Sequence, residues 1–254
     1  MPDLHPLAHG FADVAAEYEL GRPGYAPEAV AAIRDGLGLA AGARIADVGA
    51  GTGKLTRALA AAPEGFDVLA VEPFDAMRAA LTAALQGVEV LDGTAEALPL
   101  PDASVDAVAC GDAFHWFDGA RAAPELARVI RPGGGLALLW NSAAGEAGEP
   151  WGAELGALLA GVRPDHPSFT GEQGREAIDA SDAFGPFTRA DVPNVQRSTR
   201  PMLVAAVASM SYVAVLPEAE RAAFLADVDA LLARHGVTAV DVPLRTTVWT
   251  ARRL

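Results

Sequence analysis

The chain has 254 residues, of which 51% are hydrophobic and 20% are charged, and its formal net charge is −14. The length is enough for one large α/β domain or a domain with a lid, and the hydrophobic fraction excludes wholesale disorder. The excess of negative charge argues against DNA or RNA as a partner, because nucleic-acid binding depends on Lys and Arg at the phosphates.

The N-terminal part, residues 1–40, is expected to form a helical cap. Apolar residues recur at helical spacing in two short segments, and a stretch rich in Gly and Pro separates them. The helices are expected at 11–18 and 28–39, with the break at 21–27.

The next part, residues 41–141, is expected to be a ligand-binding core. Short apolar runs alternate with segments of helical periodicity, which is the pattern of βαβ units around a parallel sheet. The last helix meets Arg131-Pro132-Gly133-Gly134, a strong helix stop. Strands are expected at 44–48, 67–72, 88–91, 105–110 and 135–140, and helices at 54–62, 74–85 and 119–130.

The regular alternation breaks after Asn141, and residues 142–254 are expected to complete the same single domain. Two late strands flank a helical insertion at about 200–236. This order suggests an antiparallel pair that completes the sheet, with the insertion lying over the ligand edge as a lid. The strands are expected at 187–198 and 244–251, and further helices near 151–161 and 172–180.

The compartment is expected to be the cytoplasm. The single cysteine, Cys110, excludes an intrachain disulfide and lies in an apolar strand, where a thiol is usually inert packing. Residues 1–10 lack a basic region followed by an apolar run, so no secretion signal is expected. Charges and prolines interrupt the longest apolar runs, so neither a transmembrane helix nor a membrane partner is expected. Monomer and homodimer stay open.

The segment Asp47-Val48-Gly49-Ala50-Gly51-Thr52-Gly53 lies between the first expected strand and the helix that follows it. Glycines at alternate positions let the backbone turn sharply and let a ligand approach the main chain, where a Cβ would collide. The next helix offers free N–H groups. Asp47 adds a negative charge that suits an ammonium group and would repel a phosphate. The segment therefore predicts a site for a polar, nucleotide-derived ligand.

Four further strand ends carry groups that can bind a ligand, and in open α/β sheets ligands bind at the carboxyl ends of the parallel strands. Glu72 ends the second expected strand, and a carboxylate about 20 residues beyond the glycines can accept hydrogen bonds from the ribose hydroxyls of an adenosine. The alternative is an acid that stabilises the N-terminus of the next helix. The other strand ends are Thr94-Ala95-Glu96, Gly111-Asp112 and Trp140-Asn141.

These motifs resemble those of the class I S-adenosylmethionine (SAM)-dependent methyltransferases, in particular the type 11 group related to ubiquinone/menaquinone and trans-aconitate methyltransferases. The resemblance covers about residues 11–141. It implies an α/β, Rossmann-like fold, with a seven-stranded, mostly parallel sheet, an antiparallel last strand and a helical lid. It also implies SAM as the methyl donor and S-adenosylhomocysteine as the product. The matching segments are 45–53, 70–73, 93–99, 113–118 and 126–134.

The resemblance implies a role for each strand-end motif. The glycine loop would hold the methionine and ribose part of SAM, Glu72 would bind the ribose hydroxyls, and Phe74 would pack on the adenine. Thr94 would face the adenine edge, where many relatives carry Asp, and the Gly111 backbone would receive the ammonium group. The residues implied in cofactor binding are Asp47, Gly49, Ala50, Gly51, Gly53, Glu72, Pro73, Phe74, Thr94, Ala95, Glu96, Gly111, Tyr18 and Arg22.

The family pattern also places an aromatic and basic N-terminal segment over SAM, here Tyr18, Arg22 and Tyr25. Arg22 would pair with the methionine carboxylate. The alternative for Arg22 is a solvent-facing charge before a proline turn.

His115 and Asp112 are the candidate catalytic residues, because both follow the fourth strand and can handle a proton or orient an acceptor. The alternative for His115 is a partly buried histidine with a structural or SAM-gating role. His166, Tyr212, Met202, Met210 and Trp151 lie in the expected lid, where they line an acceptor pocket or pack in the lid core.

The expected function is methyl transfer to a small-molecule acceptor by in-line displacement, with O-methylation of a carboxylate or hydroxyl favoured over C or N. The first rival, a nicotinamide-dependent oxidoreductase, would need Gly-x-Gly-x-x-Gly and no acid beside its pyrophosphate. The second rival, a SAM-binding protein without methyl transfer (cyclase-like or regulatory), shares the motifs. No His, Cys and Asp cluster has metal-ligand spacing, so no metal is expected.

Overall fold

The structure is a computed structural model that describes residues 6–144, 150–163, 178 and 181–254. Its centre is a seven-stranded sheet with the order β3-β2-β1-β4-β5-β7-β6. β7 runs antiparallel to both of its neighbours, and the other pairs are parallel, which confirms the expected sheet. The strands are β1 (Arg44–Val48), β2 (Asp67–Val71), β3 (Glu89–Leu91), β4 (Val105–Gly111), β5 (Ile130–Ala143), β6 (Thr188–Thr199) and β7 (Ala239–Arg252).

Helices cover both faces of the sheet, as a parallel sheet with apolar residues on both faces requires. One face packs on α5, with Leu126 and Leu138 in the same fully buried cluster. The other face packs on α2 and α3, with Ile33, Leu59 and Leu139 in a second cluster. The helices of this part are η1 (Pro6–Asp13), α1 (Ala15–Gly21), α2 (Pro27–Leu37), α3 (Lys54–Ala60), α4 (Asp75–Ala84), η2 (Phe114–Trp116) and α5 (Gly119–Val129).

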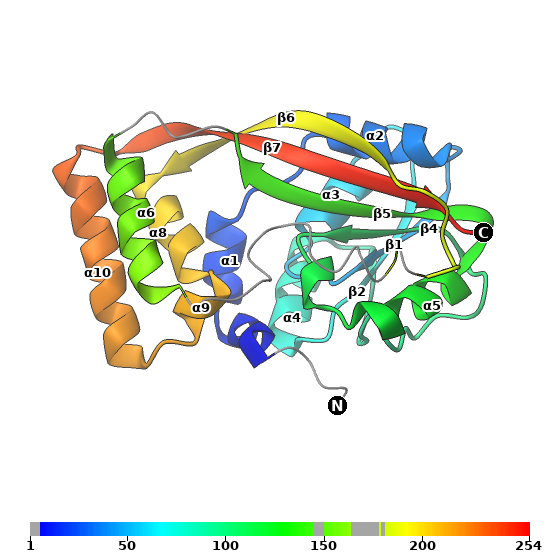
Figure 1. Cartoon of the computed structure of the whole chain (residues 1–254), viewed down its shortest axis with the longest axis horizontal. Helices are drawn as coiled ribbons and strands as arrows, with labels where there is room; N and C mark the ends of the chain where they lie inside the picture. Colours follow the sequence, from blue (N-terminus) through cyan, green and yellow to red (C-terminus); the bar gives the residue numbers. More distant parts are fainter. Residues whose placement is uncertain (1–5, 145–149, 164–177, 179–180) are drawn as a thin grey trace.

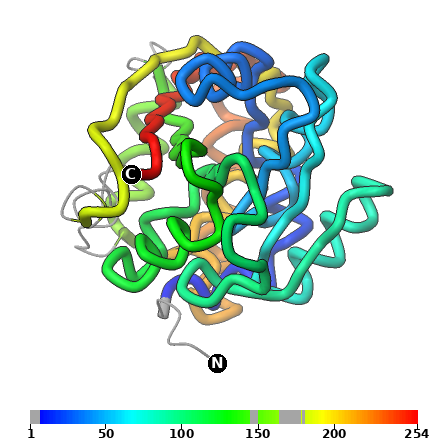
Figure 2. The backbone as a smooth tube through the Cα atoms, turned by 90° about the vertical axis from the view of Figure 1, so that its right-hand side faces the viewer, coloured from blue at the N-terminus to red at the C-terminus, as the bar shows by residue number. Residues whose placement is uncertain are grey.

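The expected helical insertion forms a lid with its own apolar cluster, which includes Leu203, Val228 and Leu232. Figure 1 shows these helices gathered at one end of the long β6–β7 ribbon, on the side toward which β5 points. In the turned view of Figure 2 the orange part of the lid lies behind the green and cyan core. The lid helices are α6 (Pro150–Val162), α8 (Arg200–Ala208), α9 (Ser211–Ala214) and α10 (Glu218–Arg234).

Several boundaries differ from the expectation, and the helix expected at 11–18 is divided between η1 and α1. α1 runs to Gly21 instead of ending at Tyr18, because Gly21 packs directly on the backbone of α8. β5 begins at Ile130, because Ile130 pairs with Val105 before a register shift that takes up Pro132 to Gly134. β7 begins at Ala239, because it stays paired with β6 beyond the rest of the sheet. The expected helix at 172–180 and His166 lie outside the described residues.

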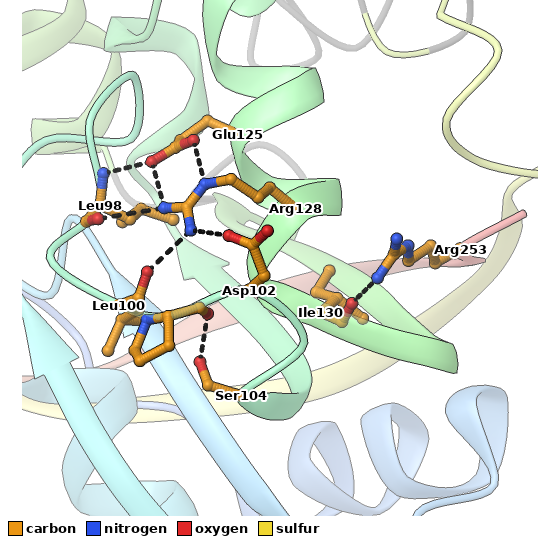
Figure 3. A network of polar contacts seen from close by, with 9 residues as sticks. Leu98, Leu100, Asp102, Ser104, Glu125, Arg128, Ile130 and Arg253 are labelled. Carbon is orange, nitrogen blue, oxygen red and sulfur yellow. Dashed lines mark hydrogen bonds and ion pairs between the residues drawn. The ribbon is translucent and has the colours of Figure 1, made fainter.

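Arg128 on α5 fixes the long loop between β3 and β4 (Figure 3). Its guanidinium donates to the Leu98 and Leu100 carbonyl oxygens at 3.2 and 2.9 Å and to Asp102 at 2.6 Å. Glu125, one turn earlier, pairs with Arg128 and accepts the Leu98 N–H at 2.8 Å. Since the same loop carries Thr94 and Ala95, this network holds the predicted adenine edge against the sheet.

Gly21 is the point at which the N-terminal cap meets the lid. A Cβ at Gly21 would lie 2.5 Å from the Ala206 Cα, so α1 and α8 would have to move apart. We expect Gly21→Ala to lower the free energy of unfolding by about 1–3 kcal/mol, the usual cost of overpacking a tight contact. Gly24→Ala is the matched control, because nothing lies within 4 Å of a Cβ there. Urea denaturation of both variants measures the difference, and equal stabilities would contradict this packing.

No helix in the described ranges is both long and apolar enough to span a bilayer.

Candidate functional site

The glycine loop after β1 is tied to β2 and turns sharply at its glycines. The Gly49 and Ala50 N–H groups both donate to the Val71 carbonyl, at 2.9 and 3.2 Å. Gly49 and Gly51 have φ of +72° and +57°, in the left-handed region that favours glycine. A Cβ at Gly49 would lie 2.7 Å from the Ala113 Cβ, whereas one at Gly51 would meet only the Tyr18 ring, at 3.8 Å. The loop is therefore packed at Gly49 and open at Gly51.

Glu72 lies directly beyond β2 and faces this open part of the loop. Its Oε2 accepts the Gly51 N–H at 2.8 Å and its Oε1 accepts the Phe74 N–H at 3.0 Å. The side chain is buried, and this desolvation raises the pKa of Glu72 to about 6. A carboxylate has about four acceptor sites, so each oxygen can accept one more donor. Glu72 can thus hold the loop and two ligand hydroxyls at once.

Asp47 is fully buried at the end of β1. Its Oδ2 accepts the Thr56 hydroxyl at 2.6 Å, while its Oδ1 has no hydrogen-bond partner among the described residues. Burial raises the pKa of Asp47 to about 7. A buried acceptor without a donor is costly, so this oxygen suits a ligand that brings an N–H group.

Thr94, Ala95 and Glu96 follow β3 but differ in what they contact. The Thr94 hydroxyl is buried and has no hydrogen-bond partner in the described ranges, which fits a polar ligand edge. Ala95 belongs to the buried core. Glu96 accepts the Asp118 N–H at 2.8 Å and so braces the turn before α5. Of the three residues, Thr94 is the one whose buried polar side chain has no hydrogen-bond partner in the described ranges.

Gly111 and Asp112 end β4, where Asp112 joins a chain of hydrogen bonds that reaches β7. The Asp112 carboxylate accepts the Tyr25 hydroxyl at 2.8 Å and the Asn141 N–H at 3.1 Å. The Thr246 hydroxyl donates to the Asn141 Oδ1 at 2.6 Å. Desolvation raises the pKa of Asp112, and its φ of +50° is unusual for a residue other than glycine. The structure thus gives Asp112 a role in positioning the cap on the sheet.

Tyr25 lies against the end of β4. Its hydroxyl would lie 2.6 Å from a Cβ at Gly111, so it covers the strand end predicted to receive the ammonium group. The sequence did not predict the contact between Thr246 and Asn141. The last strand carries several threonines, and its pattern does not show which of them faces Asn141.

His115 lies on η2 beside Trp116, with ring centroids 4.8 Å apart. The Trp140 Nε1–H donates to the His115 Nδ1 at 3.4 Å. A neutral imidazole with an accepting Nδ1 carries its proton on Nε2. His115 therefore presents an N–H donor to its surroundings in the neutral form.

Arg22 and Tyr18 lie where the cap meets the lid. The Arg22 Nε and Nη2 donate to the Ser209 hydroxyl and carbonyl oxygens at 2.9 and 3.1 Å, and its guanidinium lies 5.5 Å from the Tyr18 ring centroid. Burial raises the pKa of Tyr18 to about 12. Arg22 is therefore held by the protein and is not a solvent-facing charge.

Three adjoining cavities meet at Tyr18 and Asp112. The strand-end cavity, of about 290 Å³, includes Asp47, Ala50, Gly111 and Asn141 in its lining. The ring cavity is the space bordered by Gly51, Glu72, Phe74 and Trp116. The arginine cavity, of about 250 Å³, is lined by Arg22, Arg163, His115 and lid residues that include Met210 and Tyr212. The sequence did not single out Arg163, whose charge alone does not distinguish it from other surface arginines.

Two of the proposed lid residues do not line these cavities. Trp151 belongs to the lid core, and Met202 does not border any of the three spaces. A larger cavity of about 490 Å³ lies between α2 and α3. Among the charged residues of its lining, Arg34 pairs with Glu64, and Lys54 and Arg57 pair with Glu19. No group of three or more His, Cys, Asp or Glu side chains in the described ranges is placed to hold a metal ion.

The residues present fit SAM, on observations independent of the resemblance. Glu72 has acceptor sites left for ribose hydroxyls, and the Asp47 Oδ1 lacks the donor that an ammonium group would supply. Phe74 borders the ring cavity, where an adenine can pack against it. A nicotinamide dinucleotide fits less well, because Asp47 would face its pyrophosphate.

Comparison with known proteins agrees with this fit. A family model described as a methyltransferase domain matches residues 46–138. An uncharacterised methyltransferase of Mycobacterium tuberculosis is 42% identical over 229 residues, which cover 90% of this chain and 88% of that protein. The structure of a provisionally assigned type II methyltransferase from Anaeromyxobacter dehalogenans matches with a TM-score of 0.60 and 28% identity, over 91% of this chain and 96% of that chain.

Two other similarities concern activity. A malonyl-(acyl-carrier protein) O-methyltransferase of Methylococcus capsulatus is 41% identical over 100 residues, which cover 38% of this chain and 36% of that protein. The cyclase SpnF shares the fold, with a TM-score of 0.52 and 20% identity over 91% of this chain and 83% of that chain.

Proposed function

Since the chain belongs to the type 11 class I SAM-dependent methyltransferases, we propose that it transfers a methyl group from SAM to an oxygen of a small-molecule acceptor. The observation that carries the use of SAM is the arrangement around the glycine loop, with the ready acceptor sites of Glu72 beside the unpartnered Asp47 Oδ1. The acceptor would enter from the lid side, because lid residues line the strand-end and arginine cavities.

When bound, SAM supplies a methyl group on a positively charged sulfur, which is already electrophilic. The residues of the chain then have to bind, orient and exclude water, so the rate gain comes from proximity and desolvation. Asp47 and Glu72 would hold the donor. Tyr18, Arg22 and the lid helices would close over it, and the Tyr25–Asp112 hydrogen bond would fix the cap in place.

The two candidate catalytic residues already accept hydrogen bonds from the protein at the atoms that would take a proton, which favours an acceptor that needs no base. The His115 Nδ1 accepts from Trp140, and the Asp112 oxygens accept from Tyr25 and Asn141. A carboxylate is ionised at neutral pH, so it can be methylated without losing a proton. The partial similarity to a malonyl-(acyl-carrier protein) O-methyltransferase supports O-methylation.

Calorimetric titration with SAM tests donor binding, and formation of S-adenosylhomocysteine in the presence of an acceptor tests transfer. Absence of SAM binding would remove the proposal entirely. The second candidate is a cyclase-like protein that binds SAM without transfer, which the fold shared with SpnF favours. SAM binding and product formation without any S-adenosylhomocysteine would support that candidate instead.

We also propose that the protein works in the cytoplasm, as a monomer or homodimer. The buried single cysteine and the net charge of −14 support a reducing compartment and a small-molecule substrate over nucleic acid.

A further inference from the structure

One face of the β6–β7 ribbon turns toward the cap and the lid, and is called here the inner face. Alternate residues of a strand share a face, and Gln196 pairs directly with Val242 of β7, so these two side chains lie on the same side. Ser198, two positions beyond Gln196, belongs to the inner face too, whereas Arg197 and Thr199 are exposed on the other. The ribbon reaches the lid helices in Figure 1. The inner face can therefore meet a ligand that lies under the lid.

Ser198 differs from the other polar residues of β6 on the inner face. Asn194 and Gln196 serve the fold, because their side-chain amides donate to carbonyl oxygens of the cap. The two acceptors are Gly24 and Gly21, at 2.9 and 3.2 Å. Ser198 is 3% exposed, and its hydroxyl makes no hydrogen bond within the described ranges. A buried hydroxyl without a partner is costly, so Ser198 is the one of these three side chains that suits a ligand.

The strand-end cavity joins Ser198 to the space for the methyl donor. This cavity, of about 290 Å³, is lined by Asp47 and Gly111 at the strand ends and by Ser198 on the ribbon side. The proposed function assigns the strand ends to the methionine part of SAM, whose sulfur carries the methyl group. A ligand on the ribbon side therefore borders the donor, as an acceptor must. The ribbon side also has apolar walls, which are Leu203 and Met210 of the lid and Val242 and Leu244 of β7.

The charged side chains that the structure describes in this lining already have partners or belong to the donor site. Asp112 accepts two hydrogen bonds from the protein, and Lys54 pairs with Glu19. Asp47 and Arg22 face the ammonium and carboxylate groups of SAM in the proposed function. A second charge on the acceptor would be buried here without a partner, which is strongly unfavourable. The ribbon side thus suits an uncharged group with an apolar body.

We propose that the ribbon side of the strand-end cavity binds the non-reacting part of the methyl acceptor, and that Ser198 determines specificity by a hydrogen bond to a neutral polar group there. The inference rests on the proposed function. A serine hydroxyl both donates and accepts, so it fits a hydroxyl or carbonyl group on an otherwise apolar body. The acceptor then carries no charge besides that of its reacting oxygen.

This assignment fixes the charge of the product. The reacting oxygen, a carboxylate oxygen in the proposed function, forms a bond to the methyl carbon while the carbon–sulfur bond breaks. The electron pair of that bond stays on sulfur, and no proton is transferred. The negative carboxylate and the positive sulfonium both become neutral, so the methylated product is uncharged.

The charge of the labelled product tests the acceptor class. The full chain is incubated with methyl-labelled SAM and a small-molecule extract of mycobacterial cells, the source of a relative that matches most of the chain. Labelled product that passes both anion and cation exchangers, above a control without protein, is the expected result. Labelled product retained by an exchanger would overturn this inference while leaving the proposed function intact. Absence of S-adenosylhomocysteine with SAM still bound would contradict the proposed function, and the inference with it.

Two neighbouring residues of β6 make a matched pair of variants. Ser198→Ala is expected to raise the KM for the recovered acceptor by about tenfold, because the polar group of the acceptor then stays unpaired. The SAM dissociation constant should stay within about twofold, since Ser198 is on the ribbon side of the cavity. Thr199→Ala is the control, because Thr199 is exposed and its side chain makes no capping hydrogen bond to α8. A Ser198→Ala variant with lowered stability and an unchanged KM would show a structural serine and overturn the proposal.

Direct calorimetric binding of the recovered acceptor, with S-adenosylhomocysteine present, gives a readout that does not depend on turnover. Weaker binding to Ser198→Ala than to Thr199→Ala is expected. Equal binding of the acceptor to the two variants would overturn the assignment of Ser198.

Discussion

Replacing Glu72 with alanine is expected to weaken SAM binding at least tenfold, and on the order of a hundredfold if both ribose hydroxyls bond to the carboxylate. Hydrogen bonds to a charged group contribute about 1.5–3 kcal/mol each. The substitution also frees the Gly51 and Phe74 N–H groups, so the loop loses its anchor. Calorimetric titration with SAM measures the change in the dissociation constant.

Glu72→Gln distinguishes the loss of acceptor oxygens from the loss of the whole side chain. The glutamine amide keeps one acceptor oxygen, but its NH₂ group faces one of the two backbone N–H groups and repels it. It should bind SAM with an affinity between those of the wild type and the alanine variant. Glu89→Ala is the matched control, since Glu89 lies on the edge strand β3 and pairs with Arg44 at the surface. Thermal unfolding of all three variants checks the fold. A wild-type dissociation constant for a folded Glu72→Ala would contradict the ribose assignment.

The sheet and its strand-end motifs were predictable because their signals are local. Apolar strands such as Val105–Gly111 and helical segments such as Gly119–Val129 each carry their own periodicity, and the residues between them fall at one edge by the topology of a parallel sheet. The same reasoning located Glu72 and Asp47. It did not show that Glu96 bonds to the Asp118 N–H, because a loop carboxylate has no period that fixes its direction.

The contacts between cap and lid were not predictable, because they join residues far apart in the chain. Gly21 meets Ala206 and Arg22 meets Ser209, and neither pair has a local sequence signal. The fold brings Arg163 to the same cavity as Arg22 and His115, and this neighbourhood could not be predicted from the sequence. A charged residue at a helix end is ordinarily a solvated one, so composition alone gave no reason to select it.

Asp47→Asn is expected to flatten the pH dependence of stability in the absence of ligand. Burial raises the pKa of Asp47 from 3.8 to about 7, so between these values the folded chain binds more protons than the unfolded chain. The free energy of unfolding is therefore highest at low pH. As the pH rises toward about 7, the ionisation of Asp47 lowers this free energy by on the order of 4 kcal/mol. Glu72, with its pKa raised to about 6, adds a smaller loss of the same sign. Urea denaturation at pH 5 and pH 8 measures the slope.

Asp67→Asn is the control for this slope, because Asp67 is an exposed residue at the start of β2. Wild type and control should lose stability between pH 5 and pH 8 by the same amount, and Asp47→Asn by less. An unchanged slope in Asp47→Asn would mean that Asp47 stays ionised in the folded chain.

The affinity for SAM should depend on pH in the opposite direction to the stability of the protein without ligand. An ammonium group beside the Asp47 Oδ1 favours the ionised carboxylate, so the affinity of the wild type for SAM should fall as the pH drops below about 7. Asp47→Asn should bind SAM at least about tenfold more weakly at pH 8, since it lacks the charge. A carboxylate that serves ligand binding should destabilise the protein without ligand and strengthen the binding of SAM, whereas a structural carboxylate should stabilise the protein without ligand. An Asn variant that binds SAM as the wild type does would leave the Asp47 Oδ1 without a function in the site.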